Sequence, residues 1–538
     1  MDAHGGRLAV EVLQRHDVDT MFTLSGGHLF VLYDGAVQTG LRLVDVRHEQ
    51  SATFAAEGWA KVTRRLGCAA LTAGPGVTNG VSALTAARMN GSPIVVLAGR
   101  APQARWGSGS LQELDHIPIV ASVTKTAATA TSAESIVAEV DAACRAARTP
   151  HRGPAFVDIP LDAFGPASIE LPDVAGAEGF RGAAPDPDAV ARVAALVRDS
   201  ARPVLIAGGD VYWAHAEGPM RAFTEAARVP VFVNGMGRGT LPADHELAFS
   251  RARSTALQQA DLVLVAGTPL DFRLGFGRFG DALVVHLCDA ASEIAAHAKL
   301  AASTAGDLAA TFAGLAEAGA APSAHDDWIA RLRAEEQSKR AAETASLDAD
   351  TDPIKPTRVY GELKKRLDRD AIVIGDGGDF VSYAGKLVES FHPGTFLDPG
   401  PYGCLGMGPG YALAAGVAHP DRQVVLLLGD GAIGFALGDF ESLVRHGVNV
   451  TAIVGNNGIW GLEKHPMQAL FGYDVVAELS PGIRYDKVIE ALGGHGELVD
   501  APADLGPALD RAFATPGVSL VNVLTDPADA YPRSSNLA

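Results

Sequence analysis

Two short polar motifs follow apolar runs late in the chain. Gly429-Asp430-Gly431 and Asn456-Asn457 each come directly after such a run, with 24 residues between the motifs. Parallel strands would deliver both to the carboxyl edge of a sheet, where open α/β folds bind ligands, and the glycines would let a diphosphate approach the backbone. The Asp430 carboxylate, the Asn457 amide oxygen and the Ile459 carbonyl are hard oxygen donors of the kind that Mg²⁺ prefers. The pattern predicts a site for Mg²⁺ and a diphosphate.

This pair of motifs resembles the cofactor-binding signature of the thiamine diphosphate enzymes. The resemblance implies that a carboxylate in a separate N-terminal domain hydrogen-bonds the aminopyrimidine ring of the cofactor. Glu49 in Arg47-His48-Glu49 meets this requirement, because it follows a strand-like segment, Leu41 to Val46, and precedes a helical apolar pattern over Ser51 to Val62. Glu49 would then polarise the ring, while the carbanion chemistry belongs to the cofactor.

Five further site residues are implied by segments that resemble those of family members. The Gly403 carbonyl would accept the pyrimidine amino group, and Leu405 would wedge an apolar side chain beneath the folded cofactor. His28, in a Gly/His loop, would exchange protons with a substrate oxygen at neutral pH. Gln112 would hydrogen-bond a carbonyl or hydroxyl of the substrate. Glu463 stands where pyruvate decarboxylases carry a glutamate, and burial beside the cofactor would raise its pKa toward that of a proton shuttle.

Chain length, net charge and cysteine content limit the classes of protein to which this chain can belong. A chain of 538 residues is too long for one hydrophobic core and suggests about three domains. The net charge of −19 argues against nucleic-acid and anionic-membrane surfaces. The sequence shows neither a signal peptide nor an apolar stretch long enough for a membrane span. We expect a cytoplasmic protein whose four scattered cysteines are small core residues: Cys68, Cys144, Cys288 and Cys404.

Apolar strand-like runs alternate with helical patterns along the chain, an order typical of parallel sheets. The predicted fold class is α/β with three doubly wound parallel-sheet domains. We place a pyrimidine-binding domain at 1–165, a Rossmann-like central domain at 186–320 and a diphosphate-binding domain at 352–530. A linker over Pro172 to Pro187 and a charged helix over Asp326 to Ser346 would join them. Strands are expected at 21–24, 41–46, 68–72, 94–98, 155–159, 203–207, 229–233, 262–266, 283–287, 371–374, 424–428, 448–454 and 519–524.

The central domain carries a weaker signal for a nucleotide. Gly208-Gly209 follows a strand without completing a GxGxxG motif, and Arg253 offers a cation for phosphate oxygens. The resemblance implies FAD in this domain for an acetolactate synthase, and an adenine nucleotide or CoA for an oxalyl-CoA decarboxylase or 2-hydroxyacyl-CoA lyase. The segment Ala252 to Leu257 resembles the CoA group more closely.

Whole-chain resemblance favours an acetolactate synthase large subunit, which decarboxylates pyruvate and joins the remaining fragment to a second 2-oxo acid. The synthase would imply a role in branched-chain amino acid biosynthesis. Glu463, Pro466 and Leu161 depart from the synthase pattern and favour the alternative, a lyase that splits a 2-hydroxyacyl-CoA into formyl-CoA and a ketone or aldehyde. A third hypothesis is an inactive homologue that only binds the cofactor. The family implies a homodimer or a dimer of dimers with active sites between subunits.

Overall fold

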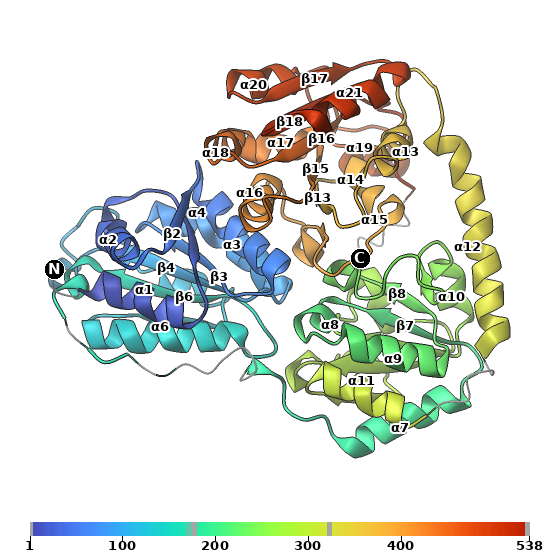
Figure 1. Cartoon of the computed structure of the whole chain (residues 1–538), viewed down its shortest axis with the longest axis horizontal. Coiled ribbons are helices and arrows are strands. Elements are labelled where there is room, and N and C mark those ends of the chain that lie inside the picture. The colour runs from blue at the N-terminus through green and yellow to red at the C-terminus, as the bar shows by residue number, and fades with distance from the viewer. Residues whose placement is uncertain (1–3, 168, 172, 174–179, 320–324, 533–538) are drawn as a thin grey trace.

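Three parallel sheets, each of six strands, form the frame of the molecule (Figure 1). The computed structural model describes residues 4–167, 169–171, 173, 180–319 and 325–532. The predicted α/β class with three parallel-sheet units is confirmed. Of the predicted linker, residues 172 and 174–179 lie outside the described residues. No helix within the described ranges is both long and apolar enough to span a bilayer.

The first sheet has the strand order β2-β1-β3-β4-β6-β5, and its faces are covered by helices from the same part of the chain. The strands are β1 (Thr20–Thr23), β2 (Arg42–Asp45), β3 (Gly67–Leu71), β4 (Ile94–Arg100), β5 (Thr126–Thr129) and β6 (Ala155–Pro160). The helices are α1 (Gly5–Arg15), α2 (Phe30–Thr39), α3 (Glu49–Thr63), α4 (Pro75–Met89), α5 (Ile117–Val120) and α6 (Ala133–Arg148).

The second sheet, in the central unit, has the order β12-β11-β10-β7-β8-β9 and one hydrophobic cluster of its own. Its strands are β7 (Pro203–Ala207), β8 (Val231–Val233), β9 (Ala248–Phe249), β10 (Leu262–Ala266), β11 (Leu283–Cys288) and β12 (Ala302–Ala305). Its helices are α7 (Pro187–Asp199), α8 (Gly209–Trp213), α9 (Glu217–Ala227), α10 (Arg253–Gln259) and α11 (Leu308–Glu317). Helix α12 (Asp326–Leu347) runs from this unit to the third, as the charged pattern predicted.

The third sheet has the order β14-β13-β15-β16-β18-β17. Its strands are β13 (Ile372–Asp376), β14 (Phe396–Leu397), β15 (Val424–Gly429), β16 (Val450–Asn456), β17 (His495–Val499) and β18 (Val518–Leu524). Its helices are α13 (Pro356–Lys364), α14 (Asp379–Ser382), α15 (Ala384–Leu387), α16 (Gly408–Ala418), α17 (Asp430–Ala436), α18 (Phe440–Arg445), α19 (Gly461–Phe471), α20 (Tyr485–Ala491) and α21 (Pro502–Ala514).

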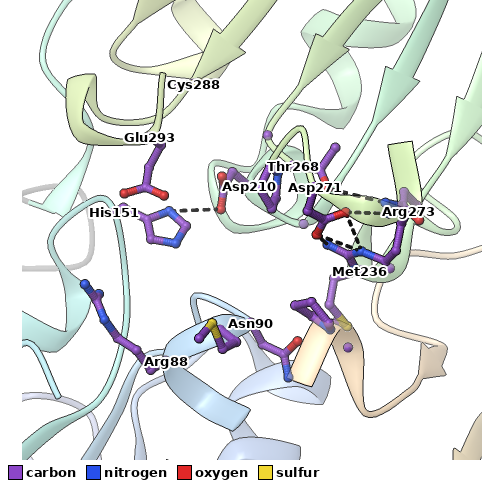
Figure 2. Close-up of a pocket in the computed structure, with 18 of the residues that line it drawn as sticks. Arg88, Asn90, His151, Asp210, Met236, Thr268, Asp271, Arg273, Cys288 and Glu293 are labelled. Atoms are coloured by element: carbon purple, nitrogen blue, oxygen red, sulfur yellow. Dashed lines mark hydrogen bonds and ion pairs between the residues drawn. The ribbon is translucent and has the colours of Figure 1, made fainter. Parts of the chain in front are cut away.

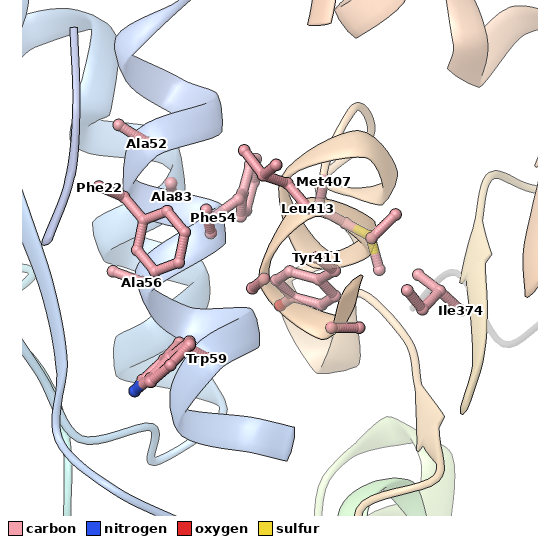
Figure 3. Packing of buried hydrophobic residues seen from close by; sticks show 14 of the residues in the cluster. Phe22, Ala52, Phe54, Ala56, Trp59, Ala83, Ile374, Met407, Tyr411 and Leu413 are labelled. Carbon is pink, nitrogen blue, oxygen red and sulfur yellow. The ribbon is translucent and has the colours of Figure 1, made fainter. Parts of the chain in front are cut away.

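A single hydrophobic cluster joins the first and third units. It contains Phe22 and Val96 from the first sheet, Ile374 and Leu426 from the third, and the facing sides of α3 and α16. Figure 3 shows the Phe54 and Tyr411 rings between the two helices, where they meet edge to face with centroids 6.0 Å apart. The first and third sheets therefore share a core. The central unit contributes Tyr212 and Trp213 of α8 to this cluster and has a second cluster around its own sheet.

Glycine lets α3 and α16 approach closely. A Cβ atom on Gly58 would lie 2.8 Å from Tyr411 Cα, and one on Gly410 would lie 2.8 Å from the Ser51 carbonyl oxygen. Both distances are shorter than ordinary van der Waals contact, so any side chain at either position would push the helices apart.

A salt-bridge network links the first unit to the central one. The side chain of His151 is only 18% exposed, and its Nδ1 lies 3.1 Å from the Asp289 carboxylate. The same nitrogen lies 3.5 Å from the Asp210 carboxylate, a contact drawn in Figure 2. Burial opposes protonation of the imidazole, but the two carboxylates outweigh it and raise the pKa of His151 to about 11. His151 is therefore a cation at neutral pH and ties the two units together electrostatically.

Three of the four cysteines confirm the expectation of core residues. Cys68, Cys144 and Cys288 are buried and free. Cys404 differs, because it is only partly buried in the loop before α16. It packs against the edge of the cluster shared by the first and third units, and its neighbours in that loop line a cavity.

Replacing Gly58 by alanine should destabilise the protein, because the added methyl group meets the backbone of α16. We expect a loss of about 1–3 kcal/mol in the free energy of unfolding, measured by urea titration. Gly218→Ala is the matched control, since nothing lies within 4 Å of a Cβ atom at that helical position. Equal stability of both variants would show that the helices are not in tight contact.

Replacing His151 by glutamine should lower the melting temperature at neutral pH, because two buried carboxylates lose their cationic partner. The pKa of His151 is about 11 in the folded protein and 6.5 ordinarily. Its stabilisation is therefore complete below about pH 6.5 and is lost as pH rises through about 11. Melting temperatures of both proteins from pH 6.5 to pH 10 should converge as pH rises. A constant difference would contradict a charged His151.

Candidate active site

The carboxyl ends of β15 and β16 bring the two polar motifs together. The strands are neighbours in parallel register, with Gly429 opposite Gly455, so Asp430 and Asn457 leave the same edge of the sheet. Nothing lies within 4 Å of a Cβ atom built on Gly429, which leaves open space beside the backbone. At Gly431 the Trp460 ring would be 2.4 Å from such an atom, so this position accepts only glycine.

Asp430 is a buried carboxylate, 5% exposed, held by backbone amides. Its two oxygens accept hydrogen bonds from Gly431 N at 3.0 Å and Gly458 N at 2.6 Å. Burial raises the pKa of Asp430 to about 6, although these amides favour the charged form. Tyr485 Oη also donates to the Asp430 carbonyl at 3.1 Å. The two amide hydrogen bonds therefore fix the position and orientation of the Asp430 carboxylate.

The neighbouring oxygens match the donor set of a hard divalent cation. The Asn457 side-chain oxygen turns back toward Ile459, whose amide N lies 3.2 Å away, and both residues line the same cavity as Asp430. A buried carboxylate next to amide and carbonyl oxygens suits Mg²⁺ and would be costly to keep without a cation.

A cavity of about 800 Å³ contains every predicted residue of the third unit. It also includes Asp379, Trp460 and Tyr531, which sequence reasoning missed. The predicted residues that line it are Gly403, Leu405, Gly429, Asp430, Gly431, Asn457, Ile459 and Glu463.

Asp376 is a further residue that the sequence analysis overlooked. It is fully buried at the end of β13 and accepts hydrogen bonds from Gly406 N at 3.1 Å and Gly408 N at 2.8 Å. Burial raises the pKa of Asp376 to about 7. These contacts fix the loop that carries Leu405. The signal was present, because Asp376 ends an apolar run just as Asp430 does.

Glu49 is the first residue of α3 and is 8% exposed. Its Oε2 accepts a hydrogen bond from Asn79 Nδ2 at 3.0 Å, and its Oε1 faces Gly76, where a Cβ atom would lie 3.5 Å away. His28 is close by, with Nδ1 3.4 Å from Thr72 Oγ1, and burial lowers its pKa. The first unit therefore groups Glu49 and His28 around one loop.

Gln112 lies against the same loop in a strained conformation. Its φ of +56° is left-handed, and a Cβ atom on Gly74 would lie 3.0 Å from Gln112 Cβ. Non-glycine residues rarely adopt such angles, and those that do cluster at functional sites. The strained backbone supports a functional role for Gln112, and the sequence alone could not reveal this strain.

A buried chain of polar groups holds that loop. Gly74 N donates to His116 Nε2 at 2.9 Å, and His116 Nδ1 is 2.8 Å from Asp158 Oδ2. Arg100 Nη1 donates to the same Asp158 oxygen at 2.8 Å. Because Nε2 accepts from an amide, His116 carries its proton on Nδ1. None of these residues was predicted, although an acid inside the apolar strand β6 was a visible signal.

Within a single chain, Glu49 does not line the 800 Å³ cavity. Glu49 is absent from the residues that line it, although the adjacent Gln50 side chain donates to the Leu405 carbonyl at 3.4 Å. The described part of the chain therefore holds two separate groups of predicted residues, one around Glu49 and one around Asp430.

A second cavity of about 550 Å³ is lined by residues of the central unit and of both its neighbours. Gly209 lines it, but Gly208 does not: a Cβ atom there would lie 2.3 Å from Thr268 Cβ, so Gly208 serves close packing. Arg253 also does not line it; its guanidinium faces the Val233 carbonyl at 3.5 Å, and burial lowers its pKa to about 10. Figure 2 shows Arg88, His151 and Arg273 around this space.

Comparison with known proteins agrees with this arrangement. Three family models of thiamine pyrophosphate enzymes match: the N-terminal TPP binding domain at 3–119, the central domain at 190–315 and the C-terminal TPP binding domain at 376–523. The acetolactate synthase large subunit of Mycobacterium tuberculosis is 55% identical, covering 99% of this chain and 98% of its own length. The 2-hydroxyacyl-CoA lyase 2 of Caenorhabditis elegans is 32% identical over 98% of this chain and 90% of its own, and the human protein of that name is 31% identical over 92% and 85%. The chain therefore belongs to the thiamine pyrophosphate enzymes.

Proposed function

We propose that this enzyme makes acetolactate, joining two molecules of pyruvate with loss of one carboxylate. The cavity beside Asp430 carries the proposal, because it gathers the residues expected to hold a diphosphate and a cation at one sheet edge. The relative with 55% identity over nearly the full length supplies the reaction. Thiamine diphosphate, when bound, supplies the nucleophilic carbon of this chemistry.

Asp430, Asn457 and the Ile459 carbonyl would hold Mg²⁺ against the diphosphate. Their oxygen donors fit that ion, and the buried Asp430 carboxylate gains a partner when it binds. Gly429 leaves the backbone open to phosphate oxygens. Leu405 would support the cofactor from the loop that Asp376 fixes.

Glu49 would hold a proton at the ring nitrogen of the pyrimidine. Asn79 orients one oxygen of its carboxylate, which leaves the other, beside Gly76, to face the ring. Gln112 would bind a substrate oxygen from its strained position, and Glu463 would move protons within the cavity. His28, whose pKa is lowered by burial, would act as a neutral hydrogen-bonding group.

Two copies of the chain would complete each site. In one chain Glu49 lies outside the cavity that contains Asp430, so a second copy is the simplest source of the missing carboxylate. Large exposed apolar side chains accompany both groups of residues: Leu111 beside Gln112, Phe435 near Trp460, and the run Leu470-Phe471. Burial of these side chains would drive association into a homodimer or a dimer of dimers.

The central cavity would take FAD or an adenine nucleotide. The carboxyl ends of β7, β8, β10 and β11 meet there, which is the ligand edge of such sheets. Most cationic side chains that line the cavity already have an acidic partner: Arg273 pairs with Asp271, and His151 pairs with Asp210. Arg88 remains as a partner for phosphate oxygens. The absorption spectrum of the purified protein distinguishes the two ligands, because only a flavin gives a yellow band.

A 2-hydroxyacyl-CoA lyase is the second candidate. Glu463 lines the cavity, and Pro466 lies inside α19, at the positions where the sequence departs from the synthase pattern. Relatives named 2-hydroxyacyl-CoA lyase 2 cover over nine tenths of the chain.

The purified enzyme with thiamine diphosphate, Mg²⁺ and pyruvate should form acetolactate, because the cavity holds the residues that the reaction needs. Product is measured after its acid conversion to acetoin. A parallel reaction with a 2-hydroxyacyl-CoA tests for formyl-CoA. Formyl-CoA without acetolactate would replace the first function by the second, and neither product from cofactor-loaded enzyme would reject both.

Glu49→Gln should abolish hydrogen exchange at C2 of bound thiamine diphosphate while the fold and cofactor binding remain. Glutamine preserves the shape of the side chain but cannot take up the ring proton. Exchange is measured by NMR after quenching in deuterated buffer, and melting temperature serves as the control for folding. Asp45→Asn, at an exposed carboxylate of the same unit, should exchange at the wild-type rate. Normal exchange in Glu49→Gln would remove this residue from the mechanism.

A further inference from the structure

A third cavity, of about 370 Å³, lies where the first unit meets the central one, outside the residues assigned above. Its walls come from the end of α3, the segment after α6, the end of α8 and the turn before α11. The lining side chains include an unusual number of one type, arginine: Arg64, Arg65, Arg148, Arg152 and Arg181.

The balance of charge around this cavity is positive, in a chain whose net charge is −19. The acids that line it are Asp289 and Asp307. Asp307 is committed to the N-terminus of α11, where its Oδ1 accepts from Ala309 N at 2.8 Å. Asp289 lies 3.1 Å from His151 Nδ1 and faces that cation. Its other oxygen, Oδ2, lies 4.0 Å from Arg152 Nη1, so the two aspartates offset only part of the charge of the five arginines.

Arginines at the rim have partners of their own. Arg64 Nη1 is 2.9 Å from Glu217 Oε1 and its guanidinium lies over the Tyr212 ring, while Arg65 Nη1 is 2.7 Å from Asp19 Oδ2. These two pairs hold the end of α3 in position. We therefore attribute the surplus positive charge of the cavity to Arg148 and Arg152, which lie farther inside.

Arg148 and Arg152 are the inner cations. Within the ranges that the structure describes, Arg148 makes no ion pair; its guanidinium stacks on the Phe180 ring, 4.1 Å from the centroid. Arg152 is 13% exposed, and its Nη1 is buried with no hydrogen bond to any described residue, 4.0 Å from Asp289 Oδ2. Burial lowers the pKa of both arginines. The two guanidinium groups are therefore held in place with few hydrogen-bond acceptors around them.

Trp213 adds an independent observation. The residue is 3% exposed and lines the cavity, yet its indole Nε1 has no hydrogen-bond partner among the residues that the structure describes. A buried N–H donor without an acceptor costs free energy, so its presence in the same cavity as two desolvated guanidinium groups indicates a missing acceptor. Asp289 Oδ2 likewise has no hydrogen bond in the described chain, but it is ion-paired with Arg152.

We propose that this cavity binds a phosphoryl oxyanion, either free phosphate or the phosphate group of a small metabolite. Guanidinium forks match phosphate oxygens in pairs, and the indole N–H supplies one more donor. The volume of about 370 Å³ exceeds the needs of phosphate alone, and Phe180 offers an aromatic surface to the body of a phosphate ester.

The position of this site would connect it to both neighbouring regions. His151 lines the central cavity and the next residue, Arg152, lines this one, with Asp289 within 4.0 Å of both side chains. Arg64 and Arg65 follow the last residue of α3, whose first residue is Glu49. A bound oxyanion would therefore clamp the end of that helix onto the central unit.

Isothermal titration of the enzyme saturated with thiamine diphosphate and Mg²⁺ tests the proposal, with inorganic phosphate as the probe in a phosphate-free buffer of low ionic strength. Saturation with cofactor keeps phosphate out of the diphosphate site. We expect saturable binding that weakens by about tenfold in Arg148→Gln, since a charge-assisted hydrogen bond is lost. Arg181→Gln, at an exposed position, repeats the test if the first variant fails to fold.

Arg221→Gln is the matched control, because this exposed arginine of α9 pairs only with Glu225 among the described residues. It should bind phosphate as wild type does. Phenyl phosphate distinguishes the two sources: tighter binding than phosphate indicates a metabolite ester, and equal binding indicates the free ion. Absence of saturable binding of either probe to wild type, or equal binding of phosphate by wild type and both cavity variants, would overturn the proposal.

Discussion

The contact between α3 and α16 is the constraint on which the rest of the structure depends. Both helices begin beside a residue proposed for the active site: α3 starts with Glu49, and α16 starts directly after the loop that carries Leu405. Because Gly58 and Gly410 let the helices touch, the shared core fixes the spacing of these two loops within a chain. Tight packing of buried apolar side chains thus fixes the positions of the residues that we propose for the cofactor site.

The strands that sequence could predict are those in the middle of the sheets. The expected strands correspond to all the interior ones and to one edge strand, β2. The missed strands are edges: β5, β9, β12, β14 and β17. Interior strands of parallel sheets are buried on both faces and read as continuous apolar runs, whereas β5, with the sequence Thr-Ala-Ala-Thr, is partly exposed and β9 has two residues. Their formation depends on a neighbour that is already in place.

The site could be predicted where one strand end carries the chemistry. Asp430 and Asn457 follow apolar runs and line one cavity, as expected from the sequence. Asn79 and His116 could not be found in this way, because they act through contacts between elements that are distant in sequence. The strain at Gln112 is likewise a property of the folded loop. The opposite holds for Arg253. Its sequence context predicted a contact with phosphate oxygens, but in the folded chain its buried guanidinium faces the Val233 carbonyl.

Helix α3 has 15 residues and is therefore about 22 Å long. One end holds Glu49, and the other is followed by Arg64, which pairs with Glu217 of the central unit. Since a helix this short and this tightly packed is nearly rigid, its ends cannot shift independently. A tilt of α3 at its far end would therefore also displace Glu49, which links the position of this acid to the contacts that the helix makes with the central unit.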